Sequence, residues 1–139
     1  MRTTCELVSN TVLPSIRAWI VREAIEKFGM KQKDVANCLG VTNSAVSQYM
    51  KEKRADIGIS EKELKQIKPL ISEIASKMAS KQLTDFELMK LMCRVCFSLR
   101  ASLILCKLHM RMEPKLKKVN CTICNELLRD YRKVRWDKI

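Results

Sequence analysis

Residues that interrupt helices are scarce in this sequence. It contains three glycines and three prolines in 139 residues, and no glycine follows Gly58. Glycine and proline are the strongest local signals for turns, so long stretches without them favour helices over turn-rich sheets. Period-2 runs of Val, Ile, Thr and aromatic residues, which would predict strands, are also scarce. The sequence therefore predicts an all-α fold.

The chain has the length of one ordinary domain or of two very small ones. Hydrophobic residues make up 47% and charged residues 30%, which allows a packed core and argues against global disorder. The turn-forming stretch "EKRADIGIS" separates two parts. We expect a helix-turn-helix DNA-binding domain over 1–58 and a helical, cysteine-rich domain over 59–139 that dimerises and binds a metal or cluster.

The net charge of +12 points to a polyanionic partner. Residues 1–57 hold nine Lys and Arg against six Asp and Glu, and residues 58–139 hold eighteen against nine. The excess is therefore not confined to one tail. A nucleic acid is the simplest such partner. The charge does not distinguish DNA from RNA, and a membrane surface fits it as well.

Two sequence features bear on location. No charged leader followed by an apolar run and a cleavage site is recognisable, and the apolar run "ASLILC" is too short to span a bilayer. The seven cysteines are an odd number, so they cannot all pair in intramolecular disulfides. We expect reduced or metal-bound thiols and a cytoplasmic protein with no membrane contact.

Three helices are predicted in the first part. "TVLPSIRAWIVREAIEKFG" (11–29) has Pro14 at a plausible first helical position and ends at Gly29. "KQKDVANCLG" (31–40) ends at a glycine, and "TNSAVSQYMK" (42–51) opens with Thr42 as N-cap.

Two capping boxes open helices in the second part. Ser60 with Glu63 precedes a stripe that suits helix pairing, including a dimer interface: Leu64, Ile67, Ile71, Ile74 and Met78. Pro69 lies inside the stripe, so we expect a kink or two short helices. Thr84 with Glu87 opens a helix that is apolar in nearly every direction, so we expect it to be buried within its domain or between subunits.

The spacing of Ala36, Gly40 and Val46 is typical of a helix-turn-helix. A small residue at 36 lets the two helices approach closely, and a glycine at 40 permits a turn with positive φ. A buried branched residue at 46 fixes the angle of the second helix.

Polar side chains of the second helix would then face base edges, because Val46 and Met50 face inward. Gln48 can pair with adenine and the serines can reach several bases. Flanking lysines and arginines would contact phosphate. The candidate DNA-binding residues are Gln32, Lys33, Thr42, Asn43, Ser44, Ser47, Gln48, Lys51, Lys53 and Arg54.

Residues 5–54 resemble the small xenobiotic-response-element-type regulators, in particular an archaeal group whose members open with Cys-Glu and "VLPxIR" and carry "GLxQxxIAxxLGVTxxAVSQYLxxKR". The chain departs from this pattern at Met30, Val35 and Met50, and Lys31 stands where a capping Ser or Thr is common. The resemblance implies a homodimeric repressor or activator that binds a short pseudo-palindromic stretch of double-stranded DNA. Related regulators often carry a cysteine-bearing helical region afterwards, for which it implies a metal or an iron–sulfur cluster.

Two Cys-x-x-Cys pairs, "CRVC" and "CTIC", are the candidate ligands of that region: Cys93, Cys96, Cys121 and Cys124. Residues at i and i+3 share one helix face, so each pair can present two thiolates to one point. Four sulfurs suit an iron–sulfur cluster or zinc. Cys106 is a reserve ligand, and His109 follows it at the same spacing.

Neither pair is followed by the glycine that zinc knuckles commonly use, and both read as helical and apolar. This favours an iron–sulfur cluster, of the four-iron type, over zinc. Cysteine is also among the most buried residue types, so purely structural thiols stay an alternative. We expect Cys38 to be an inert core residue and His109 to lie at the surface.

The sequence thus predicts a homodimeric, sequence-specific transcription regulator that senses redox or metal state. The alternative is a structural or RNA-binding adaptor with structural cysteines. An enzyme is not expected, because the chain lacks a glycine-rich phosphate loop and a βαβ context for a redox Cys pair, and it contains one histidine.

Overall fold

The computed structural model describes residues 1–51 and 58–133, and this part of the chain is helical without any strand. The all-α prediction is confirmed. Two of the elements, η1 and η2, are π-helical turns. The elements are α1 (Thr4–Leu7), η1 (Val8–Val12), α2 (Leu13–Arg22), η2 (Glu23–Lys27), α3 (Gln32–Leu39), α4 (Asn43–Lys51), α5 (Glu61–Ala79), α6 (Asp85–Ala101), α7 (Ile104–Met112), α8 (Pro114–Lys118) and α9 (Ile123–Lys133).

The first helix starts earlier than predicted. α1, η1, α2 and η2 follow one another without a break, and the run begins after Thr3, whose side chain forms a capping box with Glu6. Pro14 is therefore inside the helical run rather than at its first position. Proline has no N–H and its ring crowds the preceding turn. The wider π turn η1 lies directly before it, where the Leu13 N–H bonds to the Val8 carbonyl.

The apolar stripe of the second part lies on α5, which is one helix although it contains Pro69. Ser60 and Glu63 form the predicted capping box. Ile67 and Ile74 have no exposed surface, because α5 packs against α2 and η2 on one side and against α6 on another. The stripe therefore pairs helices within the chain and is not free to form a dimer interface.

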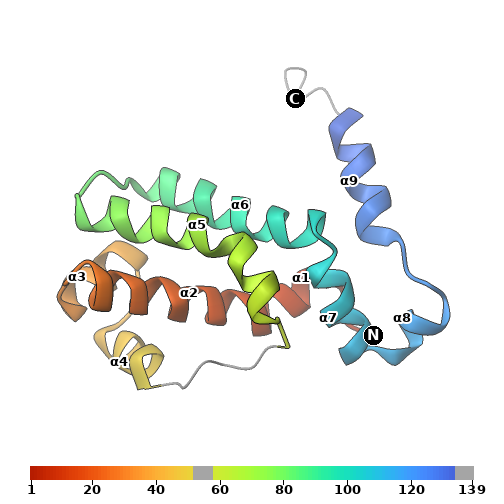
Figure 1. The fold of residues 1–139 in the computed structure, drawn as a ribbon, viewed down its shortest axis with the longest axis horizontal. Helices are drawn as coiled ribbons and strands as arrows, with labels where there is room; N and C mark the ends of the chain where they lie inside the picture. Colours follow the sequence, from red (N-terminus) through yellow and green to blue (C-terminus); the bar gives the residue numbers. More distant parts are fainter. Residues whose placement is uncertain (52–57, 134–139) are drawn as a thin grey trace.

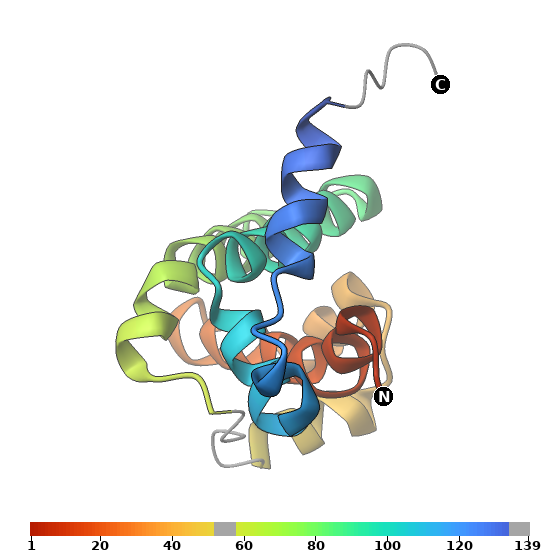
Figure 2. The ribbon, with the colours of Figure 1, turned by 90° about the vertical axis from the view of Figure 1, so that its right-hand side faces the viewer.

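Figure 1 shows α5 and α6 lying side by side above the run of α2 and α3, with α4 beneath. The largest group of buried apolar side chains is continuous and extends from Leu7 to Leu108. Residues of both segments predicted from sequence, 1–58 and 59–139, contribute to it. The second view shows α9 leading away from this body (Figure 2).

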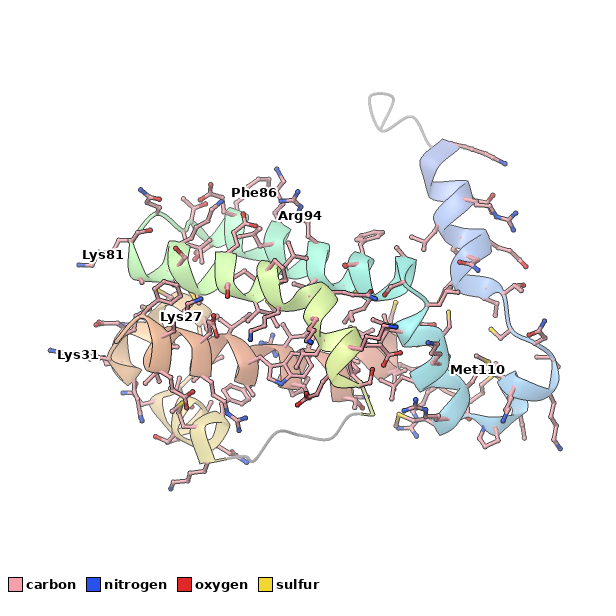
Figure 3. All side chains as sticks on the ribbon, in the orientation of Figure 1. Lys27, Lys31, Lys81, Phe86, Arg94 and Met110 are labelled. Atoms are coloured by element: carbon pink, nitrogen blue, oxygen red, sulfur yellow. The ribbon has the colours of Figure 1, made fainter. Side chains whose placement is uncertain are left out.

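The prediction that α6 is surrounded by packing partners is wrong for the single chain. Thr84 and Glu87 cap the helix as expected, and Leu91, Val95 and Leu99 face the core. On the opposite side, Phe86 is 69% exposed, Met89 60% and Phe97 53%. Figure 3 shows Phe86 and Arg94 pointing away from the neighbouring helices.

The histidine was predicted at the surface but is buried. His109 on α7 is 8% exposed, and its Nε2 lies 2.7 Å from the Arg2 carbonyl oxygen. Its Nδ1 lies 3.4 Å from Thr4 Oγ1, which is also 3.5 Å from the sulfur of Cys124 on α9. These contacts join the start of the chain to α7 and α9. Across the residues that the structure describes, no helix combines the length and apolarity that a bilayer crossing requires.

Candidate nucleic-acid interface and cysteine groups

The turn between α3 and α4 has the conformation that its glycine predicts. Gly40 follows α3 with φ 64° and ψ 35°, in the left-handed region. The Val41 N–H donates to the Ala36 carbonyl at 3.1 Å, and the Gly40 N–H donates to the Asn37 carbonyl at 3.4 Å. This pair of bonds is the Schellman arrangement, which closes a helix and redirects the chain.

The second helix of the pair is fixed at its start and along its inner face. Thr42 Oγ1 accepts a hydrogen bond from the Ala45 N–H at 3.1 Å, so Thr42 is the N-cap as predicted. Val46 has no exposed surface and Ala36 is 3% exposed, and α4 contacts both α2 and α3. Lys31 caps α3 without a side-chain hydrogen bond.

The structure places most of the candidate DNA-binding side chains on the outside. Ser47 is half-buried, and Lys53 and Arg54 lie outside the described residues. The exposed candidates are Gln32, Lys33, Thr42, Asn43, Ser44, Gln48 and Lys51. The first residues of α3 and the first two turns of α4 thus form one polar surface.

One hydrogen bond across this surface was not predicted. Ser47 Oγ on α4 donates to Gln32 Oε1 at the start of α3, at 2.9 Å. With its oxygen occupied, the Gln32 amide keeps its NH₂ group for another acceptor. Sequence patterns gave no signal for this bond, because the two residues are in different helices.

The first cysteine pair lies on α6 beside residues of the first part. Cys93 is exposed, Cys96 is half-buried, and both line a cavity that Cys38 of α3 also lines. Burial, and then the carboxylate of Asp34, raise the pKa of Cys38. This thiol is therefore a poorer nucleophile than an ordinary cysteine.

An arginine separates Cys96 from Cys5. Arg100 Nη2 donates to Cys5 Sγ at 3.4 Å, and Cys96 is a further hydrogen-bonding neighbour of the guanidinium. Burial alone lowers the pKa of Arg100, but its hydrogen bonds with the two thiol groups raise it overall. A fixed positive charge between the two sulfurs disfavours a metal cation there. The i, i+4 spacing of residues 96 and 100 could have predicted this neighbour, whereas no local pattern places Cys5 beside them.

The second cysteine group lies between α7 and α9. Burial, and then the neighbouring thiols of Cys124 and Cys121, raise the pKa of Cys106 to about 11. Cys124 is 5% exposed and faces Thr4. Cys121 precedes α9, so the prediction of two helical pairs is wrong for the second one. Asn120, with φ 50°, ends the segment before Cys121. The Thr122 carbonyl accepts a hydrogen bond from the Glu126 N–H at the start of α9.

The cysteines thus fall into two groups rather than one. Within residues 1–51 and 58–133, no three or more Cys, His, Asp or Glu side chains are placed to hold a metal ion. The four predicted ligands Cys93, Cys96, Cys121 and Cys124 all belong to this part of the chain, as does Cys106. The iron–sulfur cluster and its zinc alternative stay predictions from the sequence.

Comparisons of the chain with protein-family models, with curated proteins and with solved structures found no match.

Proposed function

We propose that this protein is a transcription regulator that binds double-stranded DNA sequence-specifically through α3 and α4. The observation that carries the proposal is the pairing of these two helices: α4 is anchored by Val46 and Thr42, and its first turns carry exposed polar side chains. In this arrangement the second helix of such a pair enters the major groove with its N-terminal residues toward the bases.

Base readout is assigned to the outer face of α4. Gln48 and Asn43 are exposed and present amides, which can donate and accept hydrogen bonds at adenine. The bond between Ser47 and Gln32 holds the start of α3 beside this face, so the Gln32 NH₂ group can reach a phosphate or a base edge.

Backbone contacts are assigned to the lysines that flank the polar surface. Lys33 and Lys51 are exposed at the start of α3 and the end of α4. The net charge of the chain, +12, would add attraction for any polyanion over a longer range. RNA binding or an adaptor role would use the same positive charge but would not require an ordered pair of α3 and α4. DNA binding is therefore the better match to this pair of helices.

We further propose that the regulator is a homodimer. A second copy would cover the exposed apolar side of α6, where Phe86 and Phe97 lie three turns apart. Large apolar side chains gathered on one exposed face are typical of interaction sites. Light scattering during size-exclusion chromatography would report a dimer, and Phe86→Ser with Phe97→Ser together should yield a folded monomer.

The experiment that tests DNA recognition starts from a binding site selected from random duplexes with the full chain. Gln48→Ala should weaken binding to the selected duplex about tenfold, because an amide pair to a base is worth about 1–3 kcal/mol, and should leave binding to an unrelated duplex unchanged. Lys51→Ala should weaken binding to both and flatten the dependence on salt.

Two exposed residues of the other helices supply matched controls: Gln66→Ala on α5 and Lys90→Ala on α6. Neither should alter binding to the selected duplex. Equal losses on both duplexes for Gln48→Ala would contradict base readout by α4. Failure to select any duplex, with tight binding to single strands or RNA instead, would favour the adaptor.

A metal or redox signal is a separate question. Iron, zinc and acid-labile sulfide measured on anaerobically purified protein, together with a visible spectrum, test the iron–sulfur prediction. Iron with sulfide would support it, and metal-free protein would leave the thiols with the packing roles that they have in the single chain.

A further inference from the structure

A cavity of about 600 Å³ lies between the DNA-binding pair and the cysteine-bearing helix. Its walls come from η1 and α2 on one side and from α6 on the other, and the residues from Asn37 to Gly40 close one part of it. Small-molecule sites in proteins have volumes of about 300–1,000 Å³. The cavity thus has the size of a ligand site.

The lining is mostly apolar. Thioether and branched side chains dominate it, including Leu13, Leu39, Leu88, Met89 and Met92. Flexible methionines adapt to ligands of different shape. Along α6 the lining extends from Asp85 to Cys96, which at the rise of an α-helix corresponds to about 17 Å. An elongated apolar body would fill such a space.

One cation is set into this apolar lining. Arg17 on α2 is half-buried and makes no hydrogen bond or ion pair with the other described residues. The other charged residue of the wall, Asp85, is exposed in the first turn of α6. A half-buried charge is less screened by water than an exposed one. The wall therefore favours a ligand with an anionic group.

The thiols in the wall suggest a different ligand, a thiophilic metal or metalloid, but the geometry does not favour it. Cys38, Cys93 and Cys96 all contribute to the lining, yet they do not form a ligand set in the described part of the chain. Cys96 also faces the guanidinium of Arg100.

We propose that this cavity binds an elongated amphipathic organic anion, with its apolar body along α6 and its anionic group on Arg17. Its regulatory consequence rests on the proposed function: the wall includes the turn that sets the angle between α3 and α4, so a ligand that prefers one position of α6 shifts the population of DNA-binding conformations.

Two fluorescent probes with one aromatic scaffold test the binding site without any DNA. 1-Anilinonaphthalene-8-sulfonate carries a sulfonate, and N-phenyl-1-naphthylamine is its neutral analogue. Both should bind the full chain at one site. Arg17→Gln should weaken binding of the sulfonate at least tenfold, because it removes a charged hydrogen-bond donor, and should leave binding of the neutral probe unchanged.

Three control variants locate the probes. Met92→Trp places a larger ring inside the cavity and should abolish binding of both. If Met92→Trp impairs folding, as measured by circular dichroism, the smaller change Leu88→Phe replaces it and should weaken both. Arg94→Gln on the exposed side of α6 should change neither affinity. Phe97→Ser removes an exposed side chain outside the cavity and should also change neither.

The proposal is overturned if Phe97→Ser abolishes probe binding while Met92→Trp does not, since the probes would then sit on the exposed face of α6. It is also overturned if Arg17→Gln affects both probes equally or neither. Because these titrations contain no nucleic acid, a protein that binds the probes but selects no duplex would refute the DNA-binding function alone.

Discussion

α4 and α6 use their apolar residues in opposite ways. The short helix α4 turns its branched residue Val46 fully into the core and leaves polar side chains outside. The longer helix α6 buries Leu91, Val95 and Leu99 but also exposes two phenylalanines. In α4, packing within one chain buries the apolar residue and leaves the polar ones exposed. In α6 it leaves two large apolar side chains exposed, which the proposed homodimer would cover.

The largest expected effect compares one substitution in both helices. Val46→Asp places a carboxylate in a site with no exposed surface, which should cost about 4 kcal/mol or more of unfolding free energy. Phe97→Asp at a 53% exposed position should change it by less than about 0.5 kcal/mol in dilute monomer. Urea unfolding followed by circular dichroism measures both, and a large loss at Phe97 would show that the two helices do not differ.

Thiol labelling sharpens the comparison within the second region. Cys93 is exposed, whereas burial and its thiol neighbours raise the pKa of Cys106 to about 11. The thiolate is the reactive form, and a pKa raised by two units lowers its population about 100-fold at pH 8. Timed iodoacetamide labelling with mass spectrometry should find Cys93 modified first and Cys106 accelerating as pH rises toward 11. Equal labelling rates of Cys93 and Cys106 at pH 8 would contradict the raised pKa of Cys106.

Gly40→Ala tests how far the α3–α4 turn depends on its glycine. A Cβ at Gly40 meets nothing within 4 Å, so the cost comes from the left-handed backbone alone, about 1 kcal/mol. At Gly58, also with positive φ, a Cβ would come within 2.6 Å of Arg111 Nη1, and Arg111 donates to the Gly58 carbonyl. Gly58→Ala should therefore destabilise at least as much as Gly40→Ala in the same urea assay. A smaller loss at 58 would mean that Arg111 moves freely.

The smallest expected effect concerns a hydrogen bond between α5 and η2. Ser72 on α5 donates to Glu23 Oε1 of η2 at 2.5 Å, and this bond is the main cause that lowers the pKa of Glu23 below its usual 4.5. A lowered pKa stabilises the fold above pH 4.5, and the stabilisation disappears as pH falls through the lower folded value. Ser72→Ala should reduce the unfolding free energy by less than about 1 kcal/mol at pH 7, and by progressively less as pH falls below 4.5. A difference that persists at low pH would assign the bond's effect to packing.

Local signals in the sequence predicted the α3–α4 pair and the starts of α5 and α6. A capping box or a left-handed glycine depends on a few neighbouring residues, so Ser60, Thr84 and Gly40 could be interpreted without the rest of the chain. Thr3 and Glu6 form the same kind of capping box, but the position of Pro14 favoured a helix that starts later in the sequence.

Contacts between distant segments could not be predicted in the same way. Periodicity shows which residues of a helix are apolar but not which element covers them, so it does not reveal that Phe86 and Phe97 of α6 are exposed in the single chain. Equal i, i+3 spacing made the two Cys pairs look alike, although Cys96 is a hydrogen-bonding neighbour of Arg100 whereas Cys124 contacts Thr4 and neighbours Cys106. The cavity at Arg17 depends on three segments that are far apart in sequence.

The continuous core that spans residues on both sides of position 58 has a consequence for modularity. Ile16 and Ile20 on α2 have no exposed surface in a core that also contains residues of α5. Recombination at position 58 would separate these partners and uncover apolar surface on both fragments. The α3–α4 pair should therefore not transfer intact to an unrelated protein, and duplication or exchange of the whole chain is the natural route to new combinations.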